Sequence, residues 1–350
     1  GGGGVGRRRR AASPLPPHTT TVATSPQNGL GFYALNTSRG ERTLVWAQDS
    51  FEPSDYETYF GTIVTALNYA LFHGIDRLVL DMTLNGGGDI CLGRAMLQAI
   101  LTTATDNYGP TDMPSSPLAR NLTRTAAAMD ITDTEWSPAF YQDQQQRAWR
   151  NDDTAWLIPG VNHTRGDGRT RPYSQLLHIS SAIPDGEYPG KCGEFPFEPS
   201  RPFKPKRILI VSRGFCGSTC ALFTNHLANY AHVRTVSIGG WSSSDAAQYS
   251  SFPGLEVLET PYYLDILDAL GQRTYDRACA TCAAPRRFDT SAGYRMCIRE
   301  IYGPSDGGTP LEYTFQAADV HVTNTRDVAL SASAAWPSLA AMLGGDGALW

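Results

Sequence analysis

Residues 213–220 read Arg-Gly-Phe-Cys-Gly-Ser-Thr-Cys. They follow an apolar stretch at 208–211 that is typical of a buried strand, and they lead into a helix-like stretch at 217–230. Ser218 is therefore predicted to lie at a turn from a strand to a helix. At such a turn the hydroxyl leaves the sheet edge, and the free N–H groups of the helix start, including that of Thr219, can hold an oxyanion.

A second strand-to-helix turn carries three consecutive glycines. The buried-strand pattern at 77–82 runs into Leu-Asn-Gly-Gly-Gly-Asp at 84–89 and then into an apolar helix. Glycines let a backbone approach a bound group closely. Acyl transfer needs a hydroxyl and converging N–H donors, so we predict Ser218 as a nucleophile, with the N–H of Thr219 and that of Gly87 or Gly88 forming the oxyanion hole.

The order of predicted elements indicates an α/β fold. Two short strands, GFYAL and TLVWAQ, precede a helix for which Ser54 is the expected N-cap and Glu57 completes a capping box. Strands and helices then alternate, and the strands are almost continuously apolar. This pattern favours a sheet covered by helices.

The chain divides into a leader, a core and two insertions. Residues 1–30 are expected to be a disordered Gly/Arg/Pro leader, and 31–350 to be the core. The regular pattern is lost at about 102–205, which indicates a large insertion, and a shorter insertion is expected at about 273–297. No internal repeat is found.

Composition narrows the class of protein. The 350 residues are 41% hydrophobic and carry a formal charge of −5, so the chain can bury a core and lacks the basic stripe of a nucleic-acid binder. No apolar run approaches the length that a bilayer requires. Seven cysteines, together with Asn-X-Ser/Thr sequons at Asn36, Asn121 and Asn162, favour a secreted glycoprotein with disulfide bonds.

The same motifs fit other interpretations. Ser218 could be a plain helix N-cap, and Cys216 and Cys220, four residues apart, could pair or stand free. The serine turn is not Gly-x-Ser-x-Gly, and the glycine turn fits neither a dinucleotide-binding fingerprint nor a Walker A motif. A methyltransferase-like motif around Asp81 is the weakest alternative. We expect no cofactor.

A metal site is not expected either. Cys279, Cys282 and Cys297 could bind zinc, but no fourth ligand is evident, and disulfides are the simpler explanation in an oxidised protein.

No general base is evident from the sequence. No lysine follows Ser218, since the chain's lysines are 191, 204 and 206. The histidines are 18, 73, 163, 178, 226, 232 and 321. His226 would lie about 12 Å from Ser218 along the same helix, which is too far for proton transfer.

Together the two turns resemble the S41 (C-terminal processing) peptidases. The matching segments are LVLDMTLNGGGD and ILIVSRGFCGSTCALF, and the GFYAL opening and the closing PLEYTFQAADVHVT resemble the fungal secreted branch of this family. The resemblance covers about 30–102 and 205–350, with the insertions unmatched. It implies a ClpP/crotonase-like β-β-α core and cleavage of polypeptide substrates.

The resemblance also implies a role for Glu312, and it implies a catalytic histidine that this sequence does not supply. Glu312 stands seven residues before Asp319, as a glutamate does in the histidine-using members, where it would orient the catalytic histidine. That histidine belongs to an N-terminal region for which this chain offers only the leader.

Three hypotheses follow. The first is a serine endopeptidase core that lacks its N-terminal region and histidine. The second is an inactive module that binds peptides or apolar ligands, as retinoid-binding relatives of this fold do. The third is a gene fragment that does not fold alone.

Overall fold

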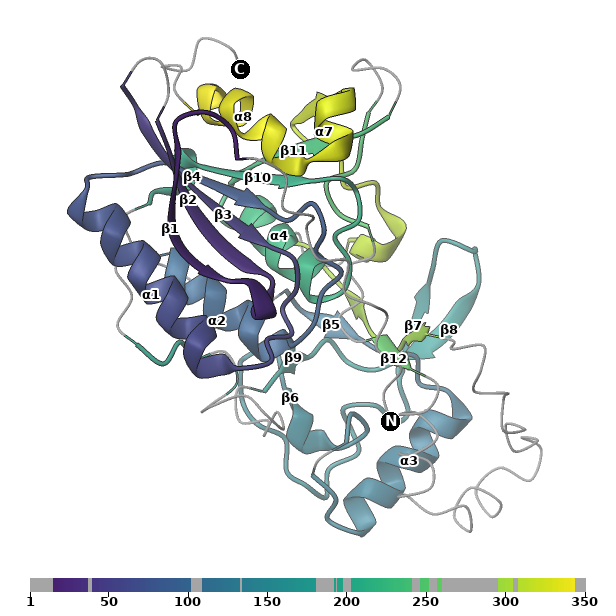
Figure 1. Cartoon of the computed structure of the whole chain (residues 1–350). Coiled ribbons are helices and arrows are strands. Elements are labelled where there is room, and N and C mark those ends of the chain that lie inside the picture. The colour runs from purple at the N-terminus through teal and green to yellow at the C-terminus, as the bar shows by residue number, and fades with distance from the viewer. Residues whose placement is uncertain are drawn as a thin grey trace.

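A computed structural model describes residues 15–36, 40–101, 109–132, 134–180, 192, 194–197, 203–240, 246–251, 257–259, 295–304 and 308–343. Its centre is a seven-stranded sheet in the order β1-β2-β3-β4-β10-β11-β15 (Figure 1). The strands are β1 (Thr19–Ser25), β2 (Leu30–Asn36), β3 (Arg42–Gln48), β4 (Leu78–Asp81), β10 (Ile208–Ser212), β11 (Arg234–Ile238) and β15 (Val320–Val322).

Strand direction divides this sheet into two parts. From β3 to β15 every neighbouring pair is parallel, whereas β1 and β2 form an antiparallel edge. The carboxyl ends of the five parallel strands therefore share one edge, which is where ligands usually bind in open α/β sheets. The mixed α/β fold expected from the sequence is confirmed.

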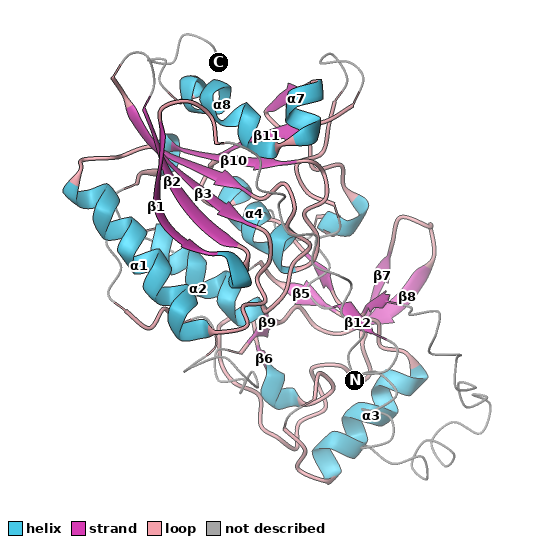
Figure 2. Cartoon of the chain, viewed as in Figure 1, coloured by secondary structure: helices cyan, strands magenta, loops and turns pink. Residues whose placement is uncertain are grey.

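Alternating apolar side chains build a core on each face of the sheet. In β4, Leu78 and Leu80 face one core while Val79 faces the other. The first core lies under α1 (Tyr56–Phe72), α2 (Ile90–Ile100) and α4 (Thr219–Asn229). The second lies under α7 (Arg326–Leu330) and α8 (Trp336–Met342), on the opposite face (Figure 2). Burial on both faces explains the nearly continuous apolar strands.

One expected helix cap is shifted by a residue. The N-cap of α1 is Asp55, whose carboxylate accepts hydrogen bonds from the N–H groups of Glu57 and Thr58, and not Ser54. Ser54 instead binds Asn28 Oδ1 through both its N–H and its hydroxyl. A carboxylate caps the positive end of the helix dipole better than a hydroxyl, which accounts for the shift.

The structure also differs from the expected leader boundary. Residues 19–25, which the sequence pattern places in the leader, form β1 and pair with β2 from Thr19↔Leu35 to Ser25↔Leu30. β1 is an edge strand with only one neighbour, and its TTTVATS sequence carries few apolar residues. Such a strand has a weak apolar signal, because its pairing depends mainly on backbone hydrogen bonds to β2.

The 102–205 stretch contains a small lobe with its own core. Its buried residues surround Trp136, Tyr141 and Trp156. The lobe's elements are β5 (Thr111–Asp112), α3 (Pro117–Ala128), β6 (Tyr141–Gln142), β7 (Val161–Thr164), β8 (Thr170–Tyr173) and β9 (His178–Ile179). One late strand, β14 (Glu300–Ile301), pairs with β5, and β12 (Val257–Glu259) pairs with β13 (Arg295–Cys297). Most of the second expected insertion, with Cys279 and Cys282, lies outside the described residues.

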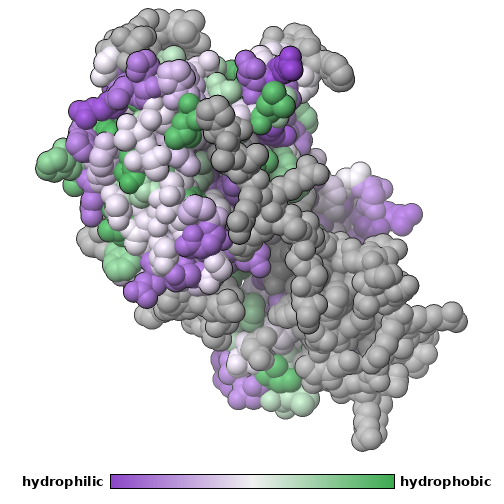
Figure 3. Space-filling model, viewed as in Figure 1, coloured by the Kyte–Doolittle hydropathy of each residue, from purple (hydrophilic) through white to green (hydrophobic). Residues whose placement is uncertain are grey.

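Among the described residues visible in Figure 3, the hydrophobic (green) ones form small separate groups between white and purple ones. Within the described ranges, no helix combines the length and the apolar character needed to cross a bilayer. The same ranges contain no group of three or more His, Cys, Asp or Glu residues arranged to hold a metal ion.

Candidate active site

Ser218 occupies a backbone conformation that side chains rarely adopt. It lies between β10 and α4 with φ 50° and ψ −129°, and its side chain is half-buried. A non-glycine residue at positive φ costs free energy and persists where the surrounding structure enforces it, often at a functional site. The Ser218 side chain makes no capping hydrogen bond, whereas Asp89 at the start of α2 does. Ser218 therefore occupies the N-cap position of α4 without capping the helix through its side chain.

A disulfide bond brackets the serine. Cys216 and Cys220 are joined with a Cα–Cα distance of 5.2 Å, and both are fully buried. The Cys216 carbonyl also accepts hydrogen bonds from Ser251 N–H, at 2.9 Å, and from the Ser250 hydroxyl, at 3.4 Å. These contacts fix the backbone on both sides of Ser218. The sequence left this pairing open, and the structure decides it.

The glycine turn lies directly against the serine turn. A Cβ atom on Gly87 would stand 2.8 Å from Ser218 Cβ, 2.8 Å from the Gly217 carbonyl oxygen and 3.1 Å from Thr219 N. Gly87 and Gly88 also have φ values of 111° and 139°. Both the lack of space and the backbone conformation require glycine at Gly87. The two turns meet because β4 and β10 are parallel neighbours, with Val211 opposite Asp81.

Hydrogen bonds distinguish the predicted oxyanion donors. The Gly87 N–H donates to Asn85 Oδ1 at 2.9 Å, so it is already occupied. The Gly88 carbonyl accepts from Thr219 Oγ1 at 2.6 Å, which joins the two turns. The N–H groups of Gly88 and Thr219 make no hydrogen bond within the described part of the chain. Of the two glycine N–H groups predicted as oxyanion donors, that of Gly88 is therefore the one without a hydrogen-bond partner among the described residues.

Asp81 and Asn85 are buried polar residues that form hydrogen bonds before and within the glycine turn. Asp81 is buried and accepts hydrogen bonds from Thr83, through its N–H and its hydroxyl, and from Trp336 Nε1 at 2.7 Å. Asn85 is also buried and donates to the Gln48 carbonyl. These contacts give both residues a structural role, and they leave the methyltransferase-like alternative for Asp81 without support.

Glu312 lies in a 3-10 helix, η5 (Leu311–Tyr313). Both of its carboxylate oxygens accept from the Ile301 N–H at 3.1 Å. Burial raises the pKa of Glu312 to about 8, because a charged carboxylate is poorly solvated there. Among the described residues, no hydrogen bond joins Glu312 to the serine turn.

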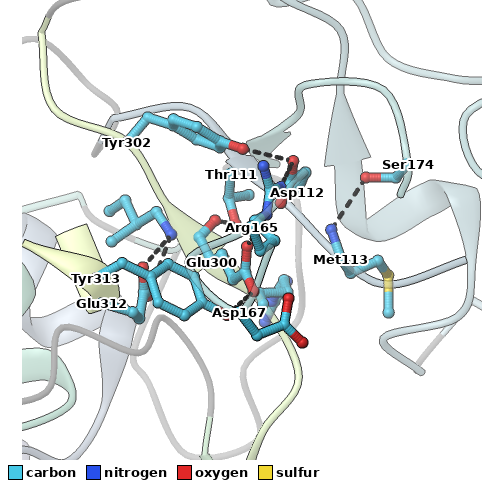
Figure 4. Close-up of polar contacts among 12 residues, drawn as sticks. Thr111, Asp112, Met113, Arg165, Asp167, Ser174, Glu300, Tyr302, Glu312 and Tyr313 are labelled. Atoms are coloured by element: carbon cyan, nitrogen blue, oxygen red, sulfur yellow. Dashed lines mark hydrogen bonds and ion pairs between the residues drawn. The ribbon is translucent and has the colours of Figure 1, made fainter. Parts of the chain in front are cut away.

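Next to Glu312 lies a buried ionic cluster that the sequence did not reveal (Figure 4). Arg165 binds Asp112 and Glu300 at 2.6 Å each. The hydroxyl of Tyr302 donates to Asp112 and that of Tyr313 to Glu300, each at 2.7 Å. The cluster joins the lobe to the segment that carries Glu312. Its members are far apart in sequence, so no local pattern could have identified it.

Comparison with known proteins gives the family context. The chain is 25% identical over 380 aligned residues to a peptidase S41 family protein of Diaporthe leptostromiformis, covering 91% of this chain and 55% of that protein. It is 23% identical to one of Aspergillus flavus, covering 81% of this chain and 64% of that protein. Its curated homologues are peptidase S41 family proteins. The expected resemblance is thereby confirmed.

The other comparisons add less. No family model matches the chain. Among solved structures it is similar to mature CPAF complexed with lactacystin, at 11% identity and a TM-score of 0.46, covering 94% of this chain and 58% of that one. The chain spans little more than half the length of the Diaporthe relative.

Two of the chain's histidines, His18 and His73, lie at the edge of the sheet away from Ser218. His18 precedes β1, and the first residue of β1, Thr19, pairs with Leu35 near the end of β2. Because β2 is antiparallel to β3, this end of β1 lies at the amino end of the parallel strands. His73 ends α1, shortly before β4 begins. Ser218 follows the carboxyl end of β10, so a strand length of about 15 Å separates it from them.

None of the other described histidines is hydrogen-bonded to Ser218. Burial lowers the pKa of His226 to about 4, and this residue lies two turns along α4. His321 Nε2 contacts the Gly239 carbonyl at 2.7 Å on a strand two places from β10, which is about 10 Å away. His163 and His178 belong to the lobe, and His232 follows α4. Within the described ranges, no hydrogen bond reaches the Ser218 hydroxyl.

Proposed function

We propose that this chain forms the core of a serine endopeptidase in which Ser218 attacks a peptide carbonyl. The observation that carries the proposal is the strained backbone of Ser218, held at φ 50° against Gly87 and beside the N–H groups of Gly88 and Thr219. A strained serine next to free backbone donors is the arrangement that acyl transfer requires. The peptidase names of the homologues support the same reaction class.

The proposed reaction follows from this arrangement. Ser218 Oγ forms a bond to the carbonyl carbon while its proton passes to a base, and the carbonyl π electrons move to the oxygen. The Gly88 and Thr219 N–H groups stabilise that oxyanion. The C–N bond then breaks and the amine leaves with a proton, and water releases the acyl group from Ser218 by the same steps.

Glu312 is proposed to orient the base, as the resemblance implies. A carboxylate oxygen has two acceptor positions, so Glu312 can bind an imidazole N–H while keeping its bond to Ile301. An imidazolium beside Glu312 would also oppose the rise in the pKa of Glu312 caused by burial, and so favour the carboxylate form.

Labelling with a fluorophosphonate, followed by intact mass, tests the nucleophile. We expect one adduct per chain, lost in Ser218→Ala and kept in Ser116→Ala, which removes a serine that truly caps a helix. Added imidazole should raise the labelling rate if the chain lacks only its base. Labelling that survives in Ser218→Ala would contradict the proposal.

A binding module without catalysis is the alternative. It is favoured by the Ser218 hydroxyl, which has no hydrogen-bonded base among the described residues. The absence of any adduct, with or without imidazole, combined with saturable peptide binding by Ser218→Ala, would support it.

We further propose that the chain is a secreted glycoprotein. Two disulfides, Cys91–Cys192 and Cys216–Cys220, are compatible with folding in an oxidising compartment. Asn36 and Asn162 are exposed sequon residues. Treatment of the protein from its native source with peptide N-glycosidase should lower its mass, and an unchanged mass would contradict glycosylation.

A further inference from the structure

Phe215 is an exposed aromatic residue three positions before Ser218. Its side chain is 60% exposed, although Cys216 and Gly217, which follow it, are buried. An exposed phenyl ring gains little for folding, because most of its apolar surface stays in water. Its position suggests a role in contacting another molecule.

The phenyl ring and the serine contact consecutive residues of one turn. Phe215 Cε1 and Cζ lie 3.5 Å from the Cβ position of Gly86, and Ser218 Cβ lies 2.8 Å from that of Gly87. Consecutive Cα atoms are about 3.8 Å apart. A group bound covalently to Ser218 would therefore have the ring as a near neighbour. Leu84, 38% exposed, adds apolar surface to the same glycine turn.

The backbone that presents Phe215 is held on both sides. Gly214, at φ 73°, precedes it, and its N–H donates to the Ser212 hydroxyl. Cys216, which follows, is held by its disulfide and by the hydrogen bond from Ser251. A side chain carried by a fixed backbone loses less conformational entropy on binding than one on a mobile loop. The backbone that carries the ring is thus fixed before a ligand arrives.

We propose that Phe215, together with Leu84, forms an apolar subsite for a side chain adjacent to the scissile bond, so that the chain selects polypeptides with an apolar residue there. The proposal rests on the proposed function of Ser218. The occupant is a polypeptide because the subsite borders the nucleophile, and its side chain is apolar because the subsite surface is a phenyl ring and a leucine.

Two fluorescein-labelled peptidyl diphenyl phosphonates that differ only in a Leu or an Asn side chain at the phosphonate residue provide the test. Their affinities are measured by anisotropy in the Ser218→Ala background, where no covalent bond can form. We expect the Leu probe to bind about tenfold more tightly than the Asn probe. Adding Phe215→Ala should bring this ratio close to one.

Phe72→Ala is the matched control. Phe72 is 85% exposed and ends α1, at the opposite edge of the sheet, so its removal should leave the ratio unchanged. Thermal unfolding confirms that each variant is folded, which is expected because both rings are exposed. A ratio that persists in Phe215→Ala, or no binding of either probe, overturns the subsite.

Adduct formation with the Ser218 chain is measured separately by intact mass. An adduct without an effect of Phe215→Ala on the affinity ratio would overturn the subsite and leave the nucleophile supported. A Phe215-dependent ratio without any adduct would overturn the peptidase proposal and keep the subsite.

Discussion

Gly87 packs so tightly against Ser218 that a methyl group on Gly87 would stand 2.8 Å from Ser218 Cβ. Real Cβ atoms essentially never approach other heavy atoms so closely. One of the two turns would have to move to admit any side chain at Gly87. The geometry of the candidate site therefore depends on the absence of that side chain.

Gly87→Ala should disrupt the site. The alanine would meet Ser218 and the Gly217 carbonyl at a φ of 111°, which costs on the order of 1–3 kcal/mol from the backbone alone. We expect lower stability in urea unfolding and loss of fluorophosphonate labelling. Gly61→Ala, in α1 with open space around it, should instead stabilise by about 0.5–1 kcal/mol. A fully stable, labelled Gly87→Ala would contradict the described contact.

The two disulfides should differ in their contribution to stability. Cys91–Cys192 closes a loop with a sequence separation of 101, whereas that of Cys216–Cys220 is 4. In the chain-entropy model, replacing both cysteines by alanine should cost about 4.5 kcal/mol for the first and about 2 kcal/mol for the second. Denaturant unfolding of the two double variants tests this order, and the reverse order would contradict it.

The same comparison separates stability from site geometry. Because Cys216 and Cys220 bracket Ser218, their replacement should reduce labelling more than replacement of Cys91 and Cys192, despite the smaller loss of stability. Equal labelling of the two double variants, each measured while folded, would show that the bracketing disulfide does not position the serine.

Arg165→Met should be strongly destabilising. The Arg165 side chain is 5% exposed, and its loss would leave Asp112 and Glu300 without their cation, which typically costs about 3–5 kcal/mol for a buried pair. Arg147→Met is the matched control, since the Arg147 side chain is 73% exposed and pairs with Asp143 at the surface. Arg147→Met should change the free energy of unfolding by no more than about 1 kcal/mol. Similar effects of the two changes in urea unfolding would contradict the buried cluster.

Glu312 should make stability depend on pH. Its pKa is raised from 4.5 to about 8, so between these values the folded chain keeps a proton that the unfolded chain releases. The free energy of unfolding should therefore fall as pH rises from about 4.5 to 8. Glu312→Gln, which keeps an acceptor for Ile301, should reduce this fall. Parallel pH curves for the two proteins in urea unfolding would contradict the raised pKa.

Much of the core was predictable from local patterns. The apolar runs that became β4 and β10, and the glycines and serine that follow them, indicated two strand-to-helix turns. Local sequence did not reveal β1, because an edge strand carries few apolar residues.

The sequence by itself determined the chemical groups of the two turns, since the serine and the three consecutive glycines are given by residue identity alone. The tertiary structure decided which groups meet: Gly87 against Ser218, Asp81 with Trp336, and Arg165 between two carboxylates. Turn and strand preferences depend on residues that are neighbours in the sequence. These contacts instead join distant segments, which only the parallel pairing of the strands and the packing of the lobe bring together.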